Sequence, residues 1–369
     1  MLVPPVRPIE WLGDCVRVID QRELPQREVH LNITTAEAMA DAIRTLAVRG
    51  APLIGIAAAM GVAVDSKRWL AGPAREFRAR VEAAIGTLAS SRPTASNLFW
   101  ALGRVRSVVE ANGDASPAEV SEAIASEALA IYEEDLETGR RMGEIGARLV
   151  KNGMTLLTHC NAGGLATSGF GTALAPMYVA KQRGVDFDVI ADETRPLLQG
   201  ARLTAWELSR AGIRVKVACD AAAHFLIARG KVDLVFVGSD RITLSGDFAN
   251  KIGTYGVALS AKESRVPFYV VAPSSTIDFG LRTGDKIPIE ERDPAEVTCL
   301  CGRRVTAEGV SAHNPAFDVT PARLVTGIIT ERGLIKRPFP RNLSRLKGKS
   351  RGRAESRRQN ARQNRRQSR

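Results

Sequence analysis

The sequence predicts an α/β protein, with a mainly helical N-terminal domain that carries a small β element and a C-terminal Rossmann-like domain built on a doubly wound parallel sheet. Two observations lead to this prediction. Apolar residues recur at helical spacing from about residue 34 to 147, and from Met154 onward short Val- and Ile-rich runs alternate with helical stretches. Such alternation is typical of parallel strands covered by helices. We therefore expect domains at 1–147 and 148–335, followed by a basic tail at 336–369.

The N-terminal domain is expected to open with two strands, because apolar and other residues alternate at 15–21 and 27–33. A helix should follow, since Thr34 and Glu37 have the spacing of a capping box. Further amphipathic helices are predicted at 71–91, at 94–111 and, with Ser116 as N-cap and Pro117 in the first turn, along 116–150.

The C-terminal domain is predicted from five short apolar runs that have the character of buried strands. They are "MTLLTH", "FDVIAD", "IRVKVA", "DLVFVG" and "PFYVVA", which begin at residues 154, 187, 213, 233 and 267. Helical patterns separate these runs, as the crossovers between parallel strands require. The last patterned segment, residues 320–333, predicts a closing helix.

The net charge of +12 is concentrated at the C-terminal end. Residues 336–369 hold fourteen Lys or Arg and a single acid, Glu355, so the rest of the chain is close to neutral. The last twenty residues contain nothing more apolar than alanine and cannot offset the entropy of ordering, so we expect the tail to be disordered. It either contacts nucleic acid or other anionic surfaces without specificity or only aids solubility, and the sequence leaves both open.

Composition excludes several classes of protein. No apolar run approaches the roughly 20 residues of a membrane span, and the first residues lack the pattern of a secretory signal. Five scattered cysteines without CxxC spacing favour a reducing, cytoplasmic location over a disulfide framework or zinc site. We expect no metal and no cofactor, because no cluster has clear ligand spacing and neither nucleotide-binding glycine pattern is present.

Polar side chains follow three of the predicted strands. Cys160 and Asn161 follow the first, acids and arginines within 192–202 follow the second, and Asp240 follows the fourth. Because the carboxyl ends of parallel strands meet at one edge, where open α/β sheets bind ligands, these groups should lie together. Taken alone, this stretch favours the interpretation of Cys160 as a small buried hydrophobic residue, as most free cysteines are.

Three segments suit an anion. Asn250 and Lys251 are predicted to begin a helix, residues 49–52 precede an apolar helix, and Arg92 precedes a helix that starts at proline. Free N–H groups and the dipole at a helix start favour anions such as phosphate. A small phosphorylated metabolite therefore fits better than a nucleotide.

These residues lie within longer strings by which the sequence resembles the family of 5-methylthioribose-1-phosphate isomerases of methionine salvage. That family is grouped with the α, β and δ regulatory subunits of translation initiation factor 2B. The matching strings are "VRGAPLIG", "RPTASNLFWAL", "THCNAGGLAT", "DETRPLLQGARLTAWEL", "GSDRI", "GDFANKIGTYG", "PFYVVAPSSTID", "IPIEER" and "NPAFDVTPARL", in family order across about residues 10–335. The resemblance implies an aldose–ketose isomerase of a phosphosugar that acts as a homodimer.

The resemblance also implies roles for individual residues. It assigns catalysis to Cys160 and Asp240. It assigns the phosphosugar contacts to Arg49, Gly50, Ala51, Arg92, Gln199, Asn250 and Lys251. The sequence departs from the family pattern at Ser239, where alanine is usual, and at Ala221, where a polar residue is usual; neither change removes a catalytic group.

The implied substrate has phosphate on its anomeric oxygen, so its ring does not open by itself. A carboxyl kept protonated by burial can supply the acid, and we assign this role to Asp240. Cys160 either removes the C2 proton as a thiolate or stabilises a direct hydride shift, and the sequence leaves both routes open. Alternative functions are isomerisation of 5-deoxyribose 1-phosphate or ribose 1,5-bisphosphate, or a non-catalytic role like that of the factor 2B subunits.

Structural roles are predicted for the neighbours of these residues. His159 should point away from Cys160 if the strand is regular, as a buried, hydrogen-bonded side chain. Asp192 is expected to pair with Arg195 or Arg202. His224 should lie on a helix and face the sheet.

Overall fold

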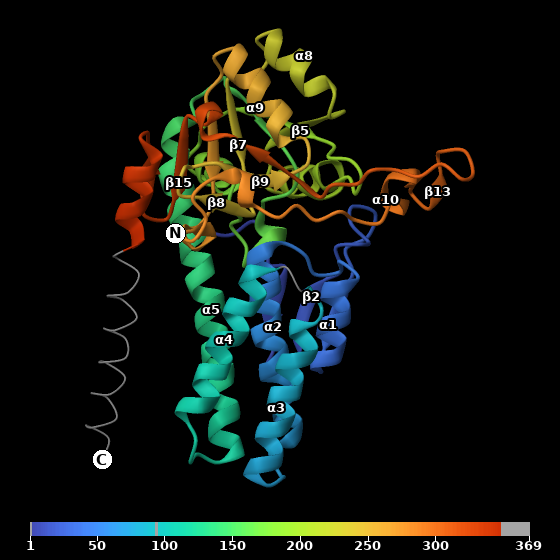
Figure 1. The fold of residues 1–369 in the computed structure, drawn as a ribbon, viewed down its shortest axis with the longest axis vertical. Coiled ribbons are helices and arrows are strands. Elements are labelled where there is room, and N and C mark those ends of the chain that lie inside the picture. The colour runs from blue at the N-terminus through green and yellow to red at the C-terminus, as the bar shows by residue number, and fades with distance from the viewer. Residues whose placement is uncertain (1, 93–94, 348–369) are drawn as a thin grey trace.

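Three antiparallel strands open the chain in the computed structural model, which describes residues 2–92 and 95–347. They are β1 (Ile9–Trp11), β2 (Val16–Ile19) and β3 (His30–Ile33), paired in that order. Five helices follow and form the lower part of the molecule in Figure 1. Their bounds are α1 (Ala36–Arg44), α2 (Ala51–Ser66), α3 (Ala74–Ala89), α4 (Ser96–Ala111) and α5 (Pro117–Gly146).

Helix α2 is the centre of this N-terminal part. Its small and apolar residues leave no polar face, and nearly all of them are buried among α1, α3, α4 and α5. Helix α5 starts at the predicted N-cap Ser116, which also forms a capping box, because Ser116 and Glu119 bond to each other's backbone N–H. The capping box predicted at Thr34 and Glu37 is wrong: the N-cap of α1 is Thr35, whose hydroxyl accepts the N–H of Ala38, and alanine cannot return a side-chain hydrogen bond.

Seven strands form the main sheet, in the order β16-β15-β10-β7-β4-β5-β6. All neighbours are parallel except β15 and β16. The bounds are β4 (Thr155–Thr158), β5 (Asp188–Asp192), β6 (Arg214–Ala218), β7 (Leu234–Val237), β10 (Phe268–Val271), β15 (Gly327–Thr330) and β16 (Gly333–Ile335).

Helices cover both faces of this sheet, so the predicted doubly wound fold is confirmed. Leu156 packs with residues of α5, α6 (Ala175–Gln182) and α7 (Ala205–Arg210), whereas its neighbour Leu157 packs with residues of α8 (Ala222–Ala228) and α9 (Thr254–Glu263). Adjacent strand residues thus enter different cores, because side chains alternate across a strand.

A second, four-stranded sheet lies beside the main one and was not predicted. Its order is β11 (Ile277–Asp278), β8 (Arg241–Thr243), β9 (Phe248–Lys251) and β14 (Phe317–Thr320). Between β11 and β14 the chain forms an arm that protrudes from the molecule in Figure 1. The arm carries α10 (Ala295–Thr298) and a hairpin of β12 (Cys299–Leu300) and β13 (Arg303–Arg304).

Two predictions near the C-terminus are wrong. The closing helix expected at 320–333 is instead strand β15, whose buried Ile328 and Ile329 extend the parallel sheet. The basic tail was expected to be disordered from residue 336, but Phe339 and Leu343 are buried against the sheet, so residues 336–347 belong to the folded protein. Residues 348–369, the remainder of the predicted tail, lie outside the described residues.

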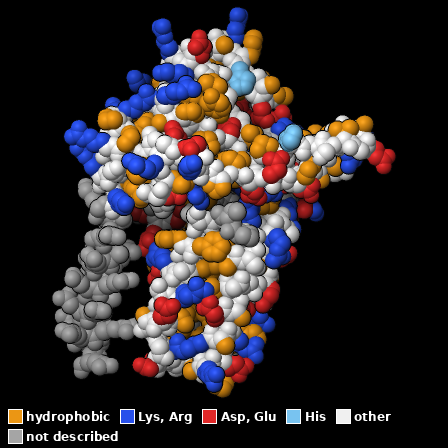
Figure 2. Space-filling model, in the orientation of Figure 1, with side chains coloured by type: hydrophobic (Ala, Val, Ile, Leu, Met, Phe, Trp, Pro, Cys, Tyr) orange, Lys and Arg blue, Asp and Glu red, His pale blue; other side chains and the backbone are white. Residues whose placement is uncertain are grey.

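The surface agrees with a nearly neutral body. In Figure 2, side chains of both charges are interspersed over the helical part of the visible face. Among the described residues, no helix has both the length and the apolar character needed to cross a membrane.

Candidate active site

Cys160 lies just beyond the carboxyl end of β4, in a turn that is held by the segment between β5 and α7. Its φ of 65° falls in the left-handed region, which is costly for a residue with a side chain. The Cys160 N–H donates to the Thr194 hydroxyl at 2.8 Å, and its carbonyl accepts from the Thr204 hydroxyl at 2.7 Å. The protein therefore fixes the direction of the thiol at the sheet edge where the sequence predicted it.

Asp240 lies between β7 and β8 at the same edge. Its N–H donates to the Ala249 carbonyl at 2.9 Å, which joins it to the strand that carries Asn250 and Lys251. Ser239, the departure from the family pattern, donates to the carbonyls of Arg241 and Ala249, so its hydroxyl braces the turn. Solvent reaches Asp240, but protein surrounds it closely enough to reduce its hydration.

Charges at this edge act on one another. Loss of hydration raises the pKa of Asp240, and the cations Lys251, Arg49 and Arg92 oppose that rise. Loss of hydration also raises the pKa of the Cys160 thiol, while Lys251 and Arg49 lower it and Asp240 adds to the rise. The structure therefore brings these five predicted residues into one electrostatic environment.

A buried polar chain that the sequence did not reveal fixes Arg49. The guanidinium donates to Asn161 Oδ1 at 2.6 Å and to the Asn161 carbonyl at 2.8 Å. Asn161 Nδ2 in turn donates to Glu207 Oε1 at 2.7 Å, and Tyr178 donates to the other carboxylate oxygen at 2.9 Å. Glu207 is 1% exposed and lies on α7, 46 positions from Asn161, so no local spacing could indicate the pair.

The remaining predicted contacts lie around this centre. Gly50 and Ala51 begin α2, and Gly50 has a φ of 101° with the backbone of Ala166 directly against it. Gln199 and Lys251 line a small hollow, and Gln199 Oε1 is buried without a hydrogen-bond partner among the described residues.

The helix start that was predicted as an anion site at Asn250 and Lys251 is wrong. Asn250 and Lys251 end strand β9 rather than begin a helix, and α9 starts at Thr254. The Asp318 carboxylate accepts the N–H groups of Gly253 and Tyr255, so it occupies the helix start itself. Lys251 can attract an anion only through its own charge. The start of the helix predicted after Arg92 falls on residues 93–94, which lie outside the described residues. Helix α4 begins at Ser96.

Two other arginines at the edge have structural roles. Arg195 donates to the carbonyls of Pro196 and Val297, which ties the arm to the sheet. Arg202 donates to three N-terminal carbonyls, those of Gln21, Arg22 and Leu24. The pairing of either arginine with Asp192 was therefore a wrong prediction.

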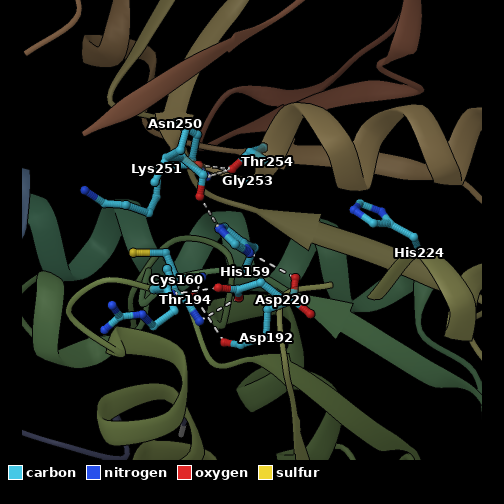
Figure 3. Close-up of polar contacts among 12 residues, drawn as sticks. His159, Cys160, Asp192, Thr194, Asp220, His224, Asn250, Lys251, Gly253 and Thr254 are labelled. Carbon is cyan, nitrogen blue, oxygen red and sulfur yellow. Dashed lines mark hydrogen bonds and ion pairs between the residues drawn. The ribbon is translucent and has the colours of Figure 1, made fainter. Parts of the chain in front are cut away.

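Asp192 instead pairs with His159. His159 Nδ1 lies 2.9 Å from Asp192 Oδ2, and both side chains are buried. His159 points away from Cys160, as expected from strand alternation (Figure 3). His224 is exposed and contacts Ser260 on α9, so the prediction that it faces the sheet is wrong.

His159, Asp192 and Asp220 bring possible metal-ligand atoms within 4.8 Å of one another. The group does not fit a metal well. Both ring nitrogens of His159 are engaged, Nδ1 by Asp192 and Nε2 by the Ile252 carbonyl. The Asp220 oxygens accept the N–H groups of Thr194 and Arg195.

Comparison with known proteins places this site in a family. The sequence profile of the initiation factor 2 subunit family matches residues 47–337, which contain all of the predicted site residues. The chain belongs to this family. A methylthioribose-1-phosphate isomerase of Geotalea uraniireducens (strain Rf4) is 49% identical over 343 residues, 93% of this chain and 99% of that protein.

Two further proteins are similar over comparable lengths. A 5-deoxyribose 1-phosphate isomerase of Moorella thermoacetica is 53% identical over 94% of this chain and 99% of that protein. The crystal structure of 5-methylthioribose 1-phosphate isomerase from Pyrococcus horikoshii OT3 superposes with a TM-score of 0.88 at 45% identity, covering 93% of this chain and 96% of that one.

Proposed function

We propose that the protein is an aldose–ketose isomerase that converts 5-methylthioribose 1-phosphate to 5-methylthioribulose 1-phosphate in methionine salvage. Relatives with the isomerase name share about half of their residues over nearly their whole length. The single structural observation that carries the proposal is that Cys160 and Asp240 follow the neighbouring strands β4 and β7 at one edge of the sheet, where Arg49 and Lys251 act on the charge of both.

Ring opening is the first chemical task. Asp240 donates a proton to the ring oxygen while the bond from that oxygen to C1 breaks, which leaves an electron-poor C1 that still carries the phosphate ester. A raised pKa keeps the carboxyl protonated at higher pH, which favours this acid role. Arg49, Arg92 and Lys251 provide positive charge for the phosphate.

Transfer of hydrogen from C2 to C1 completes the reaction, and two routes balance. In one, Cys160 as a thiolate removes the C2 proton to give an enol, which gains a proton at C1 and loses one from the C2 hydroxyl. In the other, hydride moves directly from C2 to C1 as the C2 hydroxyl loses its proton. In the second route the thiol only stabilises charge. Neither route consumes an external oxidant or reductant.

The Moorella relative gives a specific reason to consider a second substrate, 5-deoxyribose 1-phosphate. The two sugars differ only in the methylthio group at C5, and one apolar group changes binding by roughly 1–3 kcal/mol. Ribose 1,5-bisphosphate would instead require further cations near C5.

An assay of the purified protein with the three sugar phosphates tests the proposal. We expect the highest kcat/KM with 5-methylthioribose 1-phosphate. Conversion of the sugar phosphate to the ketose is monitored by NMR. If the deoxy sugar reacts better, the Moorella-like activity is correct. If none of the three reacts, the protein is a non-catalytic subunit like those for which the family is named.

Three finer statements belong to the same proposal. The resemblance to the isomerases supports a homodimer, and the cysteine pattern supports a location in the cytoplasm. The basic tail contacts nucleic acid without specificity. Gel filtration with light scattering tests the dimer. If the tail contacts nucleic acid, the protein should bind mixed-sequence RNA in a salt-sensitive way, and this binding should be lost when residues 348–369 are removed.

A further inference from the structure

His159 connects two segments of the site. Its Nδ1 contacts Asp192 Oδ2 at 2.9 Å, and its Nε2 contacts the Ile252 carbonyl at 2.8 Å. His159 directly precedes Cys160 in the chain, and Ile252 directly follows Lys251. The imidazole therefore spans from the end of β5 to the end of β9, and it connects the segment of Cys160 with the segment of Lys251.

Packing makes this contact rigid. The His159 side chain is 1% exposed. A Cβ at Gly253 would lie 2.8 Å from His159 Cε1, so the loop after Lys251 rests directly on the ring. Asp318 holds the same loop from the other side by accepting the Gly253 N–H at 2.8 Å. Figure 3 shows His159 between this loop and Asp192, with the Cys160 and Lys251 side chains pointing to the same side of it.

The hydrogen bonds also define the proton on the ring. A backbone carbonyl can only accept, so Nε2 must carry a hydrogen that it donates to Ile252. Nε2 is therefore not free to exchange protons with a substrate. Its contacts explain why this histidine is buried without taking part in the chemistry assigned to Cys160 and Asp240.

We propose that His159 is a positioning residue for isomerisation, whose imidazole sets the Cys160 turn and the Lys251 segment at their working separation by bridging Asp192 and Ile252. This inference rests on the proposed function. A shift of about 1 Å between groups that act on one substrate can reduce turnover about 100-fold. The effect should therefore fall on kcat.

Three variants separate the role of the bridge from that of charge. In His159→Gln the amide nitrogen can reach Ile252 but not Asp192, and in His159→Asn it can reach Asp192 but not Ile252. In Asp192→Asn the new amide can still donate to Nδ1 of a neutral imidazole, which keeps both contacts and removes the charge. We expect about 100-fold lower kcat in the first two variants and a loss within about 5-fold in the third.

His224→Gln is the matched control, because His224 is an exposed histidine on α8 that contacts Ser260 and lies apart from His159 and Cys160 in Figure 3. Its kcat and KM should stay within about 2-fold of the wild type. All proteins are assayed with the preferred sugar phosphate, well below their unfolding midpoints. A residue that only stabilises the fold would lower the midpoint and leave kcat per folded molecule unchanged.

The results have distinct meanings. Wild-type kcat in folded His159→Gln, or a loss in Asp192→Asn as large as in His159→Gln, overturns the positioning role. If the histidine variants do not fold, the Gly253→Ala variant tests the positioning role, because it displaces the loop while His159 remains. A kcat about 10-fold lower supports the bridge, and an unchanged kcat overturns it. A wild-type protein without turnover contradicts the proposed function instead.

Discussion

The side chain of Arg49 is held by an asparagine 112 positions away, because Asn161 accepts its hydrogen bonds through both the side-chain and the backbone oxygen. The opposite end of the same amide donates to Glu207, a carboxylate that is 1% exposed. An amide with an acceptor and a donor end is the simplest group that can link a cation to a buried anion. The orientation of Arg49 at the site therefore depends on a residue inside the protein.

Replacing this amide should reduce substrate binding and stability together. Asn161→Leu keeps the approximate volume but removes the side-chain contacts with Arg49 and Glu207, which leaves Arg49 with the backbone carbonyl alone. We expect KM for the sugar phosphate to rise about 10- to 100-fold, because Arg49 is no longer directed, and the free energy of unfolding to fall by about 2 kcal/mol, because buried polar groups lose partners. Steady-state kinetics and urea denaturation measure the two effects.

Tyr178→Phe is the control for this variant. Tyr178 donates to the same Glu207 carboxylate but does not contact Arg49. It should cost about 1 kcal/mol of stability and leave KM within about 2-fold. An equal rise of KM in both variants would mean that these hydrogen bonds affect KM through a general loss of rigidity in the protein and not through Arg49.

Removal of either catalytic group should abolish most turnover. Asp240→Asn keeps the shape but cannot protonate the ring oxygen, and Cys160→Ala removes the thiol. We expect kcat to fall at least about 1000-fold in each, consistent with loss of a positioned acid or base. Product formation is followed by NMR, and circular dichroism verifies folding. Retention of wild-type kcat in either variant would refute the assignment of that residue.

The pH dependence should distinguish the two hydrogen-transfer routes. Both pKa values are raised, chiefly by loss of hydration. Asp240 must be protonated, so its contribution is present at low pH and is lost as pH rises through its pKa. A Cys160 base must be a thiolate, so its contribution appears as pH rises through the thiol pKa.

Proton abstraction needs the protonated acid and the thiolate together, so kcat/KM should pass through a bell-shaped profile whose two limbs both depend on these groups. Hydride shift needs no thiolate, so kcat/KM should only decrease as Asp240 loses its proton. Cys160→Ser identifies the thiol limb, because a serine hydroxyl does not ionise in this range. A bell that persists in Cys160→Ser would contradict assignment of a limb to the thiol.

The sequence predicted the elements and the edge of the sheet better than it predicted the contacts. Periodicity located β4, β5 and β7, so Cys160 and Asp240 could be placed at a common edge. Periodicity could not separate a buried strand from a helix at 320–333, where few residues alternate clearly. It also suggested that Asn250 begins a helix, because "NKIG" leads into α9 without a break in composition.

Long-range pairs were inaccessible to the sequence for a different reason. Asp192 has two arginines within ten positions, yet it pairs with His159, 33 positions earlier. Parallel strands place residues side by side that are separated by a whole crossover helix. Local charge patterns therefore suggested Arg195 and Arg202, whose guanidinium groups are instead engaged by backbone carbonyls.

A single methyl group at Gly50 should disrupt the start of α2. Gly50 has a φ of 101°, and a Cβ there would lie 2.5 Å from the backbone of Ala166. Gly50→Ala thus combines backbone strain with a clash that no side-chain rotation can relieve. We expect kcat/KM to fall more than about 100-fold, because Arg49 moves with the turn, and stability to fall by more than about 2 kcal/mol.

Gly153→Ala isolates the contribution of strain. Gly153 also has a positive φ, 81°, but no atom lies within 4 Å of a Cβ added there. This variant should lose about 1 kcal/mol and keep kcat/KM within about 2-fold, as measured by urea denaturation and steady-state kinetics. Equal stability losses in the two variants would show that strain alone accounts for Gly50. Unchanged kcat/KM in Gly50→Ala would mean that this turn does not position the phosphosugar contacts.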